Sequence, residues 1–101
     1  MFDKERVIQL ASTTVNNDTI GQPVQTETTT DVIADLRSVT LTEWTNARQL
    51  GLSASYQAVV WSNEYSGQEY VYVSSKKYHV YRTYETGDKI ELYLEEMVGH
   101  A

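Results

Sequence analysis

The sequence contains no cysteine, which excludes disulfide bonds and thiolate metal ligands. Its two histidines, His79 and His100, are far apart and have no cluster of carboxylates beside them, so we expect no metal site and no cofactor. One proline and five glycines in 101 residues are too few for a disordered or low-complexity chain. No apolar run approaches the length of a membrane-spanning helix. We therefore expect one domain over residues 1–101, with no membrane partner.

Basic residues are also scarce, since eight lysines and arginines face 14 acidic residues, for a net charge of -6. A protein that grips nucleic acid with its whole surface needs a basic stripe to neutralise phosphates. The charge balance argues against that class, and equally against binding to anionic membranes. The first ten residues mix acids with bases and have no long apolar run, so we do not expect a signal peptide.

No residue pattern typical of an active site is present. The sequence has no glycine-rich phosphate loop and no GxGxxG motif. His79 is out of phase with its apolar neighbours Tyr78 and Val80, which favours a surface or interface histidine over a catalytic one. Paired acids such as Glu95 and Glu96 are too common in an acidic protein to indicate general acid–base catalysis. We predict that the protein is not an enzyme.

Tyrosine is abundant, with eight residues against one phenylalanine and two tryptophans, and it suits half-buried sheets and interfaces. The clearest element is an antiparallel hairpin over residues 77–96, with its turn at residues 85–88. Its second strand alternates the apolar Ile90, Leu92 and Leu94 with polar side chains. Its first strand is expected to place four side chains on one face: Tyr78, Val80, Arg82 and Tyr84.

The first third of the chain predicts strands around a long loop. Residues 6–12 form a first strand. Residues 13–23 are polar, contain the turn cluster Asn16-Asn17-Asp18 and end at the only proline, so they predict a loop. That loop either reverses the chain or reaches a neighbouring subunit as an arm. Residues 24–30 and 32–37 then form two strands, or two halves of one bent strand.

The spacing of apolar residues changes after these strands. Leu41 and Trp44 share a face at helical spacing, and Thr40 followed by Glu43 fits a capping box. The pattern predicts one short helix over about residues 41–50, before a glycine. We expect Leu41 and Trp44 to close one end of the sheet core.

The remaining segments complete a β-rich fold. Residues 56–62 form a strand that is apolar on both faces, as in the centre of a closed barrel or in an interface. Residues 69–73 form a further strand, and residues 97–101 a short tail. We predict a mainly β protein, a small antiparallel β-barrel of six or seven strands with one short helix inserted between strands. The aromatic residues that suit an interface are Trp61, Tyr70, Tyr72, Tyr81 and Tyr93.

A small barrel with aromatic strands also resembles an OB-fold in outline. Four tyrosines could stack on bases: Tyr70, Tyr72, Tyr78 and Tyr81. Few cations accompany them, whereas a single strand is held by a basic groove. A small barrel that binds single-stranded nucleic acid is therefore kept as an alternative.

Several segments carry a family resemblance. The strand RVIQL is followed by NDTIGQPV, close to a D-x-x-G-x-P-V pattern, and then by a strand that leads into the helix. Residues 78–94 fit the pattern Y-x-V-Y-R-T-Y followed by D-x-I-E-L-Y-L. In this order, the segments resemble the head–tail joining family of long-tailed bacteriophages, also called head-closure or stopper proteins.

The resemblance implies a structural virion protein, a small β-barrel with one helix and no enzymatic activity. Such proteins form a homo-oligomeric ring, dodecameric in the family, at the neck between capsid and tail. The portal adaptor lies above the ring and a tail terminator or completion protein lies below. The ring helps to retain packaged double-stranded DNA, which passes the lumen without sequence-specific binding, and it offers the tail a docking surface. The protein would be made in the bacterial cytoplasm and end in the virion.

The family further implies that a loop closes the lumen or contacts a partner. The candidates are the segment around the helix and the polar loop, with Asn16, Asn17, Asp18, Thr19, Ile20, Gly21 and Gln22. A tail-side neck protein, such as a tail terminator or completion protein, is the alternative within the virion. Such proteins usually carry more helix packed on a sheet.

Overall fold

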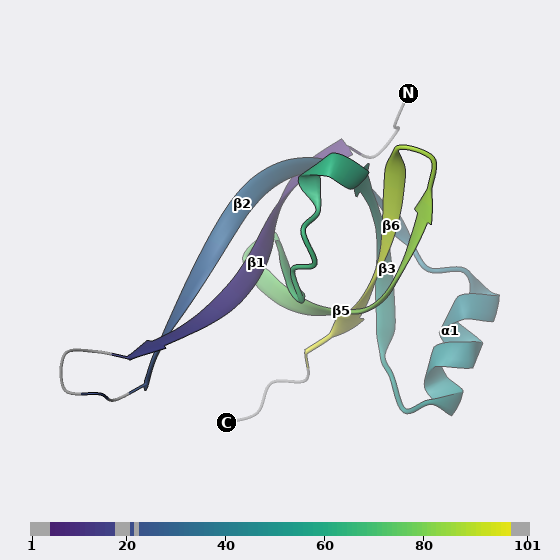
Figure 1. The fold of residues 1–101 in the computed structure, drawn as a ribbon. Helices are drawn as coiled ribbons and strands as arrows, with labels where there is room; N and C mark the ends of the chain where they lie inside the picture. The colour runs from purple at the N-terminus through teal and green to yellow at the C-terminus, as the bar shows by residue number, and fades with distance from the viewer. Residues whose placement is uncertain (1–4, 18–20, 22, 98–101) are drawn as a thin grey trace.

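The computed structural model describes residues 5–17, 21 and 23–97. Six strands, all paired antiparallel, close into a barrel in the order β1-β2-β3-β6-β5-β4, with one α-helix between β2 and β3 (Figure 1). The elements are β1 Glu5–Asn17, β2 Pro23–Ser38, α1 Leu41–Gln49, β3 Ala54–Trp61, the 3-10 turn η1 Ser62–Glu64, β4 Tyr70–Val73, β5 Lys76–Thr86 and β6 Lys89–Glu96. The predicted fold class is confirmed.

The predicted loop over residues 13–23 is wrong at both ends. β1 continues to Asn17, and β2 already begins at Pro23. β-branched residues such as Thr13 and Val15 favour extended backbone, so the first strand runs on through the polar stretch. Proline is tolerated as the first residue of a strand, because no ladder hydrogen bond is needed from its nitrogen.

The outer part of the β1–β2 hairpin projects beyond the barrel as a two-stranded ribbon, which we call the β1–β2 arm (residues 13–17 and 23–27; Figure 1). β4 pairs with β1 only over Gln9–Ala11, and β3 pairs with β2 only over Asp35–Ser38. In the described chain, no other strand therefore pairs with the arm. The molecule is elongated, with extents of 49 × 30 × 23 Å. β2 is a single long strand that includes both of the segments expected at residues 24–30 and 32–37.

The inner faces of the strands fill the barrel with apolar side chains, and Leu92 and Leu94 of the predicted hairpin are fully buried. The alternation expected for β6 is therefore confirmed. Burial of this core is the main source of stability in so small a domain. The buried cluster consists of Ile8, Leu10, Val32, Ala34, Leu36, Ala58, Val60, Val71, Val73, Tyr78, Ile90, Leu92 and Leu94.

One predicted strand face is wrong, that of Tyr78, Val80, Arg82 and Tyr84. Val80 pairs with Leu94 of β6. The next pair joins Arg82 to Tyr93, so Tyr81 has no partner of its own and the strand is bulged there. The extra residue inverts the alternation beyond it, and Arg82 and Tyr84 therefore lie on the outer face. An alternation pattern carries no signal for such an insertion.

α1 lies on the outside of the barrel, beside β3, and not across its end (Figure 1). Half of the predicted capping box is present, because Thr40 Oγ1 accepts a hydrogen bond of 3.1 Å from the backbone N–H of Glu43. The Glu43 carboxylate instead accepts hydrogen bonds from Arg82. The expectation that Leu41 and Trp44 close the core is wrong. Leu41 is 77% exposed and Trp44 is exposed as well, while Ala47 is the buried residue of the helix. The helix thus packs through its smallest side chain.

The connection from β3 to β4 packs against the core in place of the helix. η1 and the residues after it run across one end of the ring (Figure 1). Tyr65 packs against the core cluster, and its hydroxyl donates a hydrogen bond of 2.7 Å to the carbonyl of Gln68. Burial, together with the charge of Glu69, raises the pKa of Tyr65. Across residues 5–17, 21 and 23–97, no helix is long and apolar enough to span a lipid bilayer.

Candidate interaction surfaces

Four of the five aromatic residues predicted for an interface lie on the outer wall of the barrel, on β4, β5 and β6. They form two separate clusters, each built around a carboxylate from another part of the chain. The four are Tyr70, Tyr72, Tyr81 and Tyr93.

The first cluster holds the base of the β1–β2 arm against β4 and β5. The hydroxyl of Tyr72 donates to Glu27 Oε1 at 2.8 Å, and Lys77 Nζ lies 3.1 Å from Glu27 Oε2. Lys77 Nζ also lies 4.4 Å from the centroid of the Tyr70 ring. The hydrogen bond from Tyr72, followed by that from Lys77, lowers the pKa of Glu27. Glu27 therefore ties β2 to the neighbouring wall at the point where the arm leaves the barrel.

The second cluster fastens α1 to the outer wall. Arg82 Nη2 donates to Glu43 Oε1 at 2.6 Å, and its Nε donates to Oε2 at 3.3 Å. The Tyr81 hydroxyl donates to Glu43 Oε2, and Arg82 stacks on Tyr93, whose hydroxyl donates to Glu91 at 2.7 Å. The hydrogen bond from Arg82 lowers the pKa of Glu43, while burial and Glu43 raise that of Tyr81. Because each polar group already has a partner, this cluster is an internal clamp.

His79 lies between the two clusters on the outer face of β5. Its Nδ1 is 2.7 Å from Glu95 Oε2, and its ring centroid is 5.6 Å from that of Tyr70. A surface or interface histidine was expected here, and the side chain of His79 is 35% exposed. In the part of the chain that the structure describes, no three His, Cys, Asp or Glu side chains gather as metal ligands.

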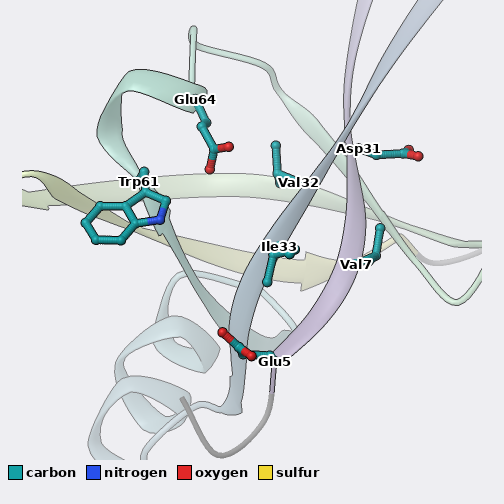
Figure 2. A pocket seen from close by; sticks show the side chains of 7 residues that line it. All are labelled: Glu5, Val7, Asp31, Val32, Ile33, Trp61 and Glu64. Atoms are coloured by element: carbon teal, nitrogen blue, oxygen red, sulfur yellow. The ribbon is translucent and has the colours of Figure 1, made fainter. Parts of the chain in front are cut away.

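Trp61, the fifth predicted aromatic residue, lies apart from the tyrosines on a different wall. It borders an open groove of about 530 Å³ between β1, β2, β3 and η1, which we call the Trp61 groove (Figure 2). Val7 is 58% exposed, Ile33 57% and Trp61 45%. The residues that line the groove are Glu5, Val7, Asp31, Val32, Ile33, Trp61 and Glu64.

The groove exists because β2 and β3 separate. Their pairing reaches only from Ser38–Tyr56 to Asp35–Val59, so Ile33 and Trp61, which would come next on the outer face, have no ladder between them. The rim formed by η1 is fixed, since the Ser62 N–H donates to the carbonyl of Asp88 at 2.8 Å. Ile33 and Trp61 are thus held partly exposed at the surface, with Lys89 Nζ 5.3 Å from the centroid of the Trp61 ring.

The sequence pointed to Trp61 but missed its neighbours. Val7 and Ile33 are register partners on the outer face of β1 and β2. Each is adjacent to a buried apolar residue, Ile8 or Val32. Two consecutive apolar residues in a strand place one of them on the solvent face, and this signal was present in the sequence.

The predicted lumen or partner loop falls at the tip of the β1–β2 arm. Asn16 and Asn17 are the last residues of β1, and Gly21 forms an exposed bend with φ +85°, a conformation that glycine adopts without strain. The remaining predicted residues, Asp18, Thr19, Ile20 and Gln22, lie outside the described residues. The arm thus places the described part of this loop beyond the barrel.

No protein-family model matches this chain, and no curated protein matches it. A function is therefore supported by the chain's own segments and by the geometry of its surfaces.

Proposed function

We propose that this protein is a non-enzymatic structural subunit of a bacteriophage neck, assembled as a head-closure ring. The ring lies between the portal adaptor and a tail terminator or completion protein, helps to retain packaged DNA and offers the tail a docking surface. The pattern in residues 78–94 and the segment NDTIGQPV support this assignment by their resemblance to the head–tail joining family. A small antiparallel barrel with one helix is the architecture that the resemblance implies.

The observation that carries the proposal is the β1–β2 arm. A two-stranded ribbon alone is marginally stable in water, and its edges present unpaired backbone groups. In a monomer no further strand of the described chain pairs its backbone with this arm, although Glu27 at its base contacts Tyr72 and Lys77. An arm of this kind is suited to contact a neighbouring subunit or to reach into the lumen of a ring, where its backbone gains partners.

The negative net charge of the chain suits a channel through which DNA passes better than a site that binds DNA. The net charge of -6 repels phosphates and reduces adhesion as the genome passes. The cations beside the tyrosines are engaged with carboxylates, Lys77 with Glu27 and Arg82 with Glu43. This pairing disfavours the alternative of a single-stranded nucleic-acid-binding barrel. The single α-helix of the described residues likewise favours head closure over a tail terminator, for which more helix is expected.

The test is genetic, in the phage genome that carries this reading frame. Deletion of the frame is expected to give heads that lose their DNA and tails that accumulate unattached, as seen by electron microscopy. A full-length copy supplied in trans restores tailed, infectious particles. Normal tailed particles from the deletion phage would contradict the proposal.

The contribution of the arm is tested by excising it while the barrel is kept. Thr13 and Glu27 are register partners, so residues 14–26 can be replaced by an Asn-Gly turn. The excision retains Glu27 and its contacts to Tyr72 and Lys77. We expect both the variant and the full chain to unfold cooperatively, but we expect the variant not to restore particles in trans. Restoration by the excised variant would remove the arm from the assembly mechanism.

A further inference from the structure

The Trp61 groove lies beside an unpaired strand edge. β2 pairs with β1 along its whole length, but with β3 only from Asp35 to Ser38. Residues 23–34 of β2 therefore have no second strand partner in the described chain. Alternate residues of an antiparallel strand direct their N–H and C=O groups to each edge, so this edge offers a row of donors and acceptors.

The same edge faces exposed apolar surface. Ile33 belongs to β2, and Trp61 and Val7 flank it from β3 and β1 (Figure 2). A strand added along residues 28–34 would continue the sheet towards β3 and cover Ile33 and Trp61 with its outward side chains. Binding by strand addition uses an unpaired edge of this kind, with the new strand about 4.8 Å from the edge strand.

The rim of the groove specifies the charge of the occupant. Three carboxylates, from Glu5, Asp31 and Glu64, surround the apolar floor. None of them forms an ion pair with another described residue. The β1–β2 arm of a second copy carries no cation in its described part, so that arm does not complement the rim. A foreign segment with lysine or arginine does.

We propose that the Trp61 groove and the free edge of β2 bind an extended, cationic and apolar segment of a different protein by strand addition. The segment pairs its backbone with β2, packs apolar side chains on Ile33 and Trp61, and directs basic side chains to the three carboxylates. This inference goes beyond the proposed neck function and does not depend on it.

The experiment uses the full chain and a peptide probe of about ten residues. Every second residue of the probe is alternately valine or lysine, with serine between them, because Asp31 and Ile33 lie on the same face of β2. Trp61 fluorescence reports binding in a Trp44→Phe background, where it is the only tryptophan. We expect saturable binding that weakens as salt increases, because charged contacts are screened. A matched peptide with glutamate in place of lysine, and a lysine peptide N-methylated throughout to remove its backbone donors, are expected to bind at least about tenfold more weakly.

Two variants of the protein locate the site. Ile33→Lys places a cation on the floor of the groove and is expected to weaken binding at least about tenfold. Val15→Lys is its matched control, because Val15 is also 57% exposed but lies on the arm, and its effect should stay within about twofold. Glu64→Gln, on the exposed η1, is expected to reduce both affinity and salt dependence.

Three results would overturn the inference. The first is equal binding of the lysine and glutamate peptides, and the second is equal binding of the N-methylated peptide. The third is self-association of the free protein, measured by sedimentation, that the lysine peptide reverses and Ile33→Lys abolishes. That result would assign the groove to a second copy. None of these outcomes bears on whether deletion of the reading frame prevents tail attachment, so the two proposals fail separately.

Discussion

The guanidinium carbon of Arg82 on β5 lies 3.9 Å from the ring centroid of Tyr93 on β6, while its nitrogens donate to Glu43 of α1. A single side chain thus joins two strands and the helix. Glu43 is 14% exposed, so the pair is partly shielded from water. Because Ala47 is the buried side chain of α1, this contact is the main polar attachment of the helix to the barrel.

Replacement of Arg82 is expected to loosen α1. Arg82→Ala should lower the free energy of unfolding by about 1–2 kcal/mol, and Arg82→Lys by about 1 kcal/mol, because lysine lacks the paired donors and the planar stack. Urea denaturation measures both values. Arg48→Ala is the control, since Arg48 stacks on Trp44 within the same helix and should cost about 0.5 kcal/mol. Equal costs at the two positions would contradict the clamp.

The clamp also predicts a pH dependence. The folded pKa of Glu43 lies below its ordinary value of 4.5, because Arg82 donates to the carboxylate. The stability from this pair is therefore complete above pH 4.5, and it is lost as the pH falls from there through the folded pKa. The difference in unfolding free energy between the native chain and Glu43→Gln should shrink between about pH 5 and pH 3. In an Arg82→Ala background this pH dependence should be weaker, and an unchanged one would assign it to another group.

Substitutions at Tyr65 and Leu41 distinguish the observed structure, in which Tyr65 packs against the core, from the expected one, in which Leu41 does. Tyr65→Ala removes a ring that packs against the core and should cost about 3 kcal/mol. Leu41→Ala removes a side chain that is 77% exposed and should change stability by less than about 0.5 kcal/mol. Thermal and urea unfolding of the two variants give the comparison. A larger loss of stability for Leu41→Ala than for Tyr65→Ala would instead support the expected packing of α1 against the core.

The β4–β5 turn stores backbone strain that glycine would relieve. Ser74 and Ser75 have φ of 52° and 69°, the left-handed region that a two-residue hairpin turn of this type requires. Ser75→Gly is expected to stabilise the protein by about 0.5 kcal/mol, because the relief of strain exceeds the added entropy of the unfolded chain. Ser53→Gly, at a position without positive φ, should destabilise it instead. A loss of stability at both positions would contradict the assignment of strain.

Period-two patterns in the sequence were sufficient to predict the barrel, because Ile90, Leu92 and Leu94 carry the signal in their own spacing. The predicted end of the first strand is wrong, because the polar Asn16 and Asn17 favour a turn locally, whereas their extended conformation depends on pairing with β2. The position of α1 was also predicted wrongly. Helical spacing identifies a face, but the tertiary contacts decide whether that face meets the core.

The candidate surfaces were predictable only in part. Trp61 was identified by its type, whereas the groove beside it depends on where β2 and β3 separate, which no local pattern encodes. The tyrosines were identified as a group, yet Tyr81 and Tyr93 are engaged by Glu43 through a bulge and a helix position that the alternation pattern concealed. A local sequence pattern is least reliable for side chains whose position depends on the pairing register between distant strands.

The β-barrel of this chain is closed by the pairing of β1 with β4, which extends only from Gln9–Tyr72 to Ala11–Tyr70. These partners are far apart in the sequence, so β1 and β2 are synthesised before the β4 strand that closes the barrel beside β1. Until the barrel closes, Ile8 and Leu10 of this hairpin are not buried in the core. The outer half of the hairpin is rich in threonine and poor in large apolar side chains, a composition that disfavours pairing with other chains before the barrel closes.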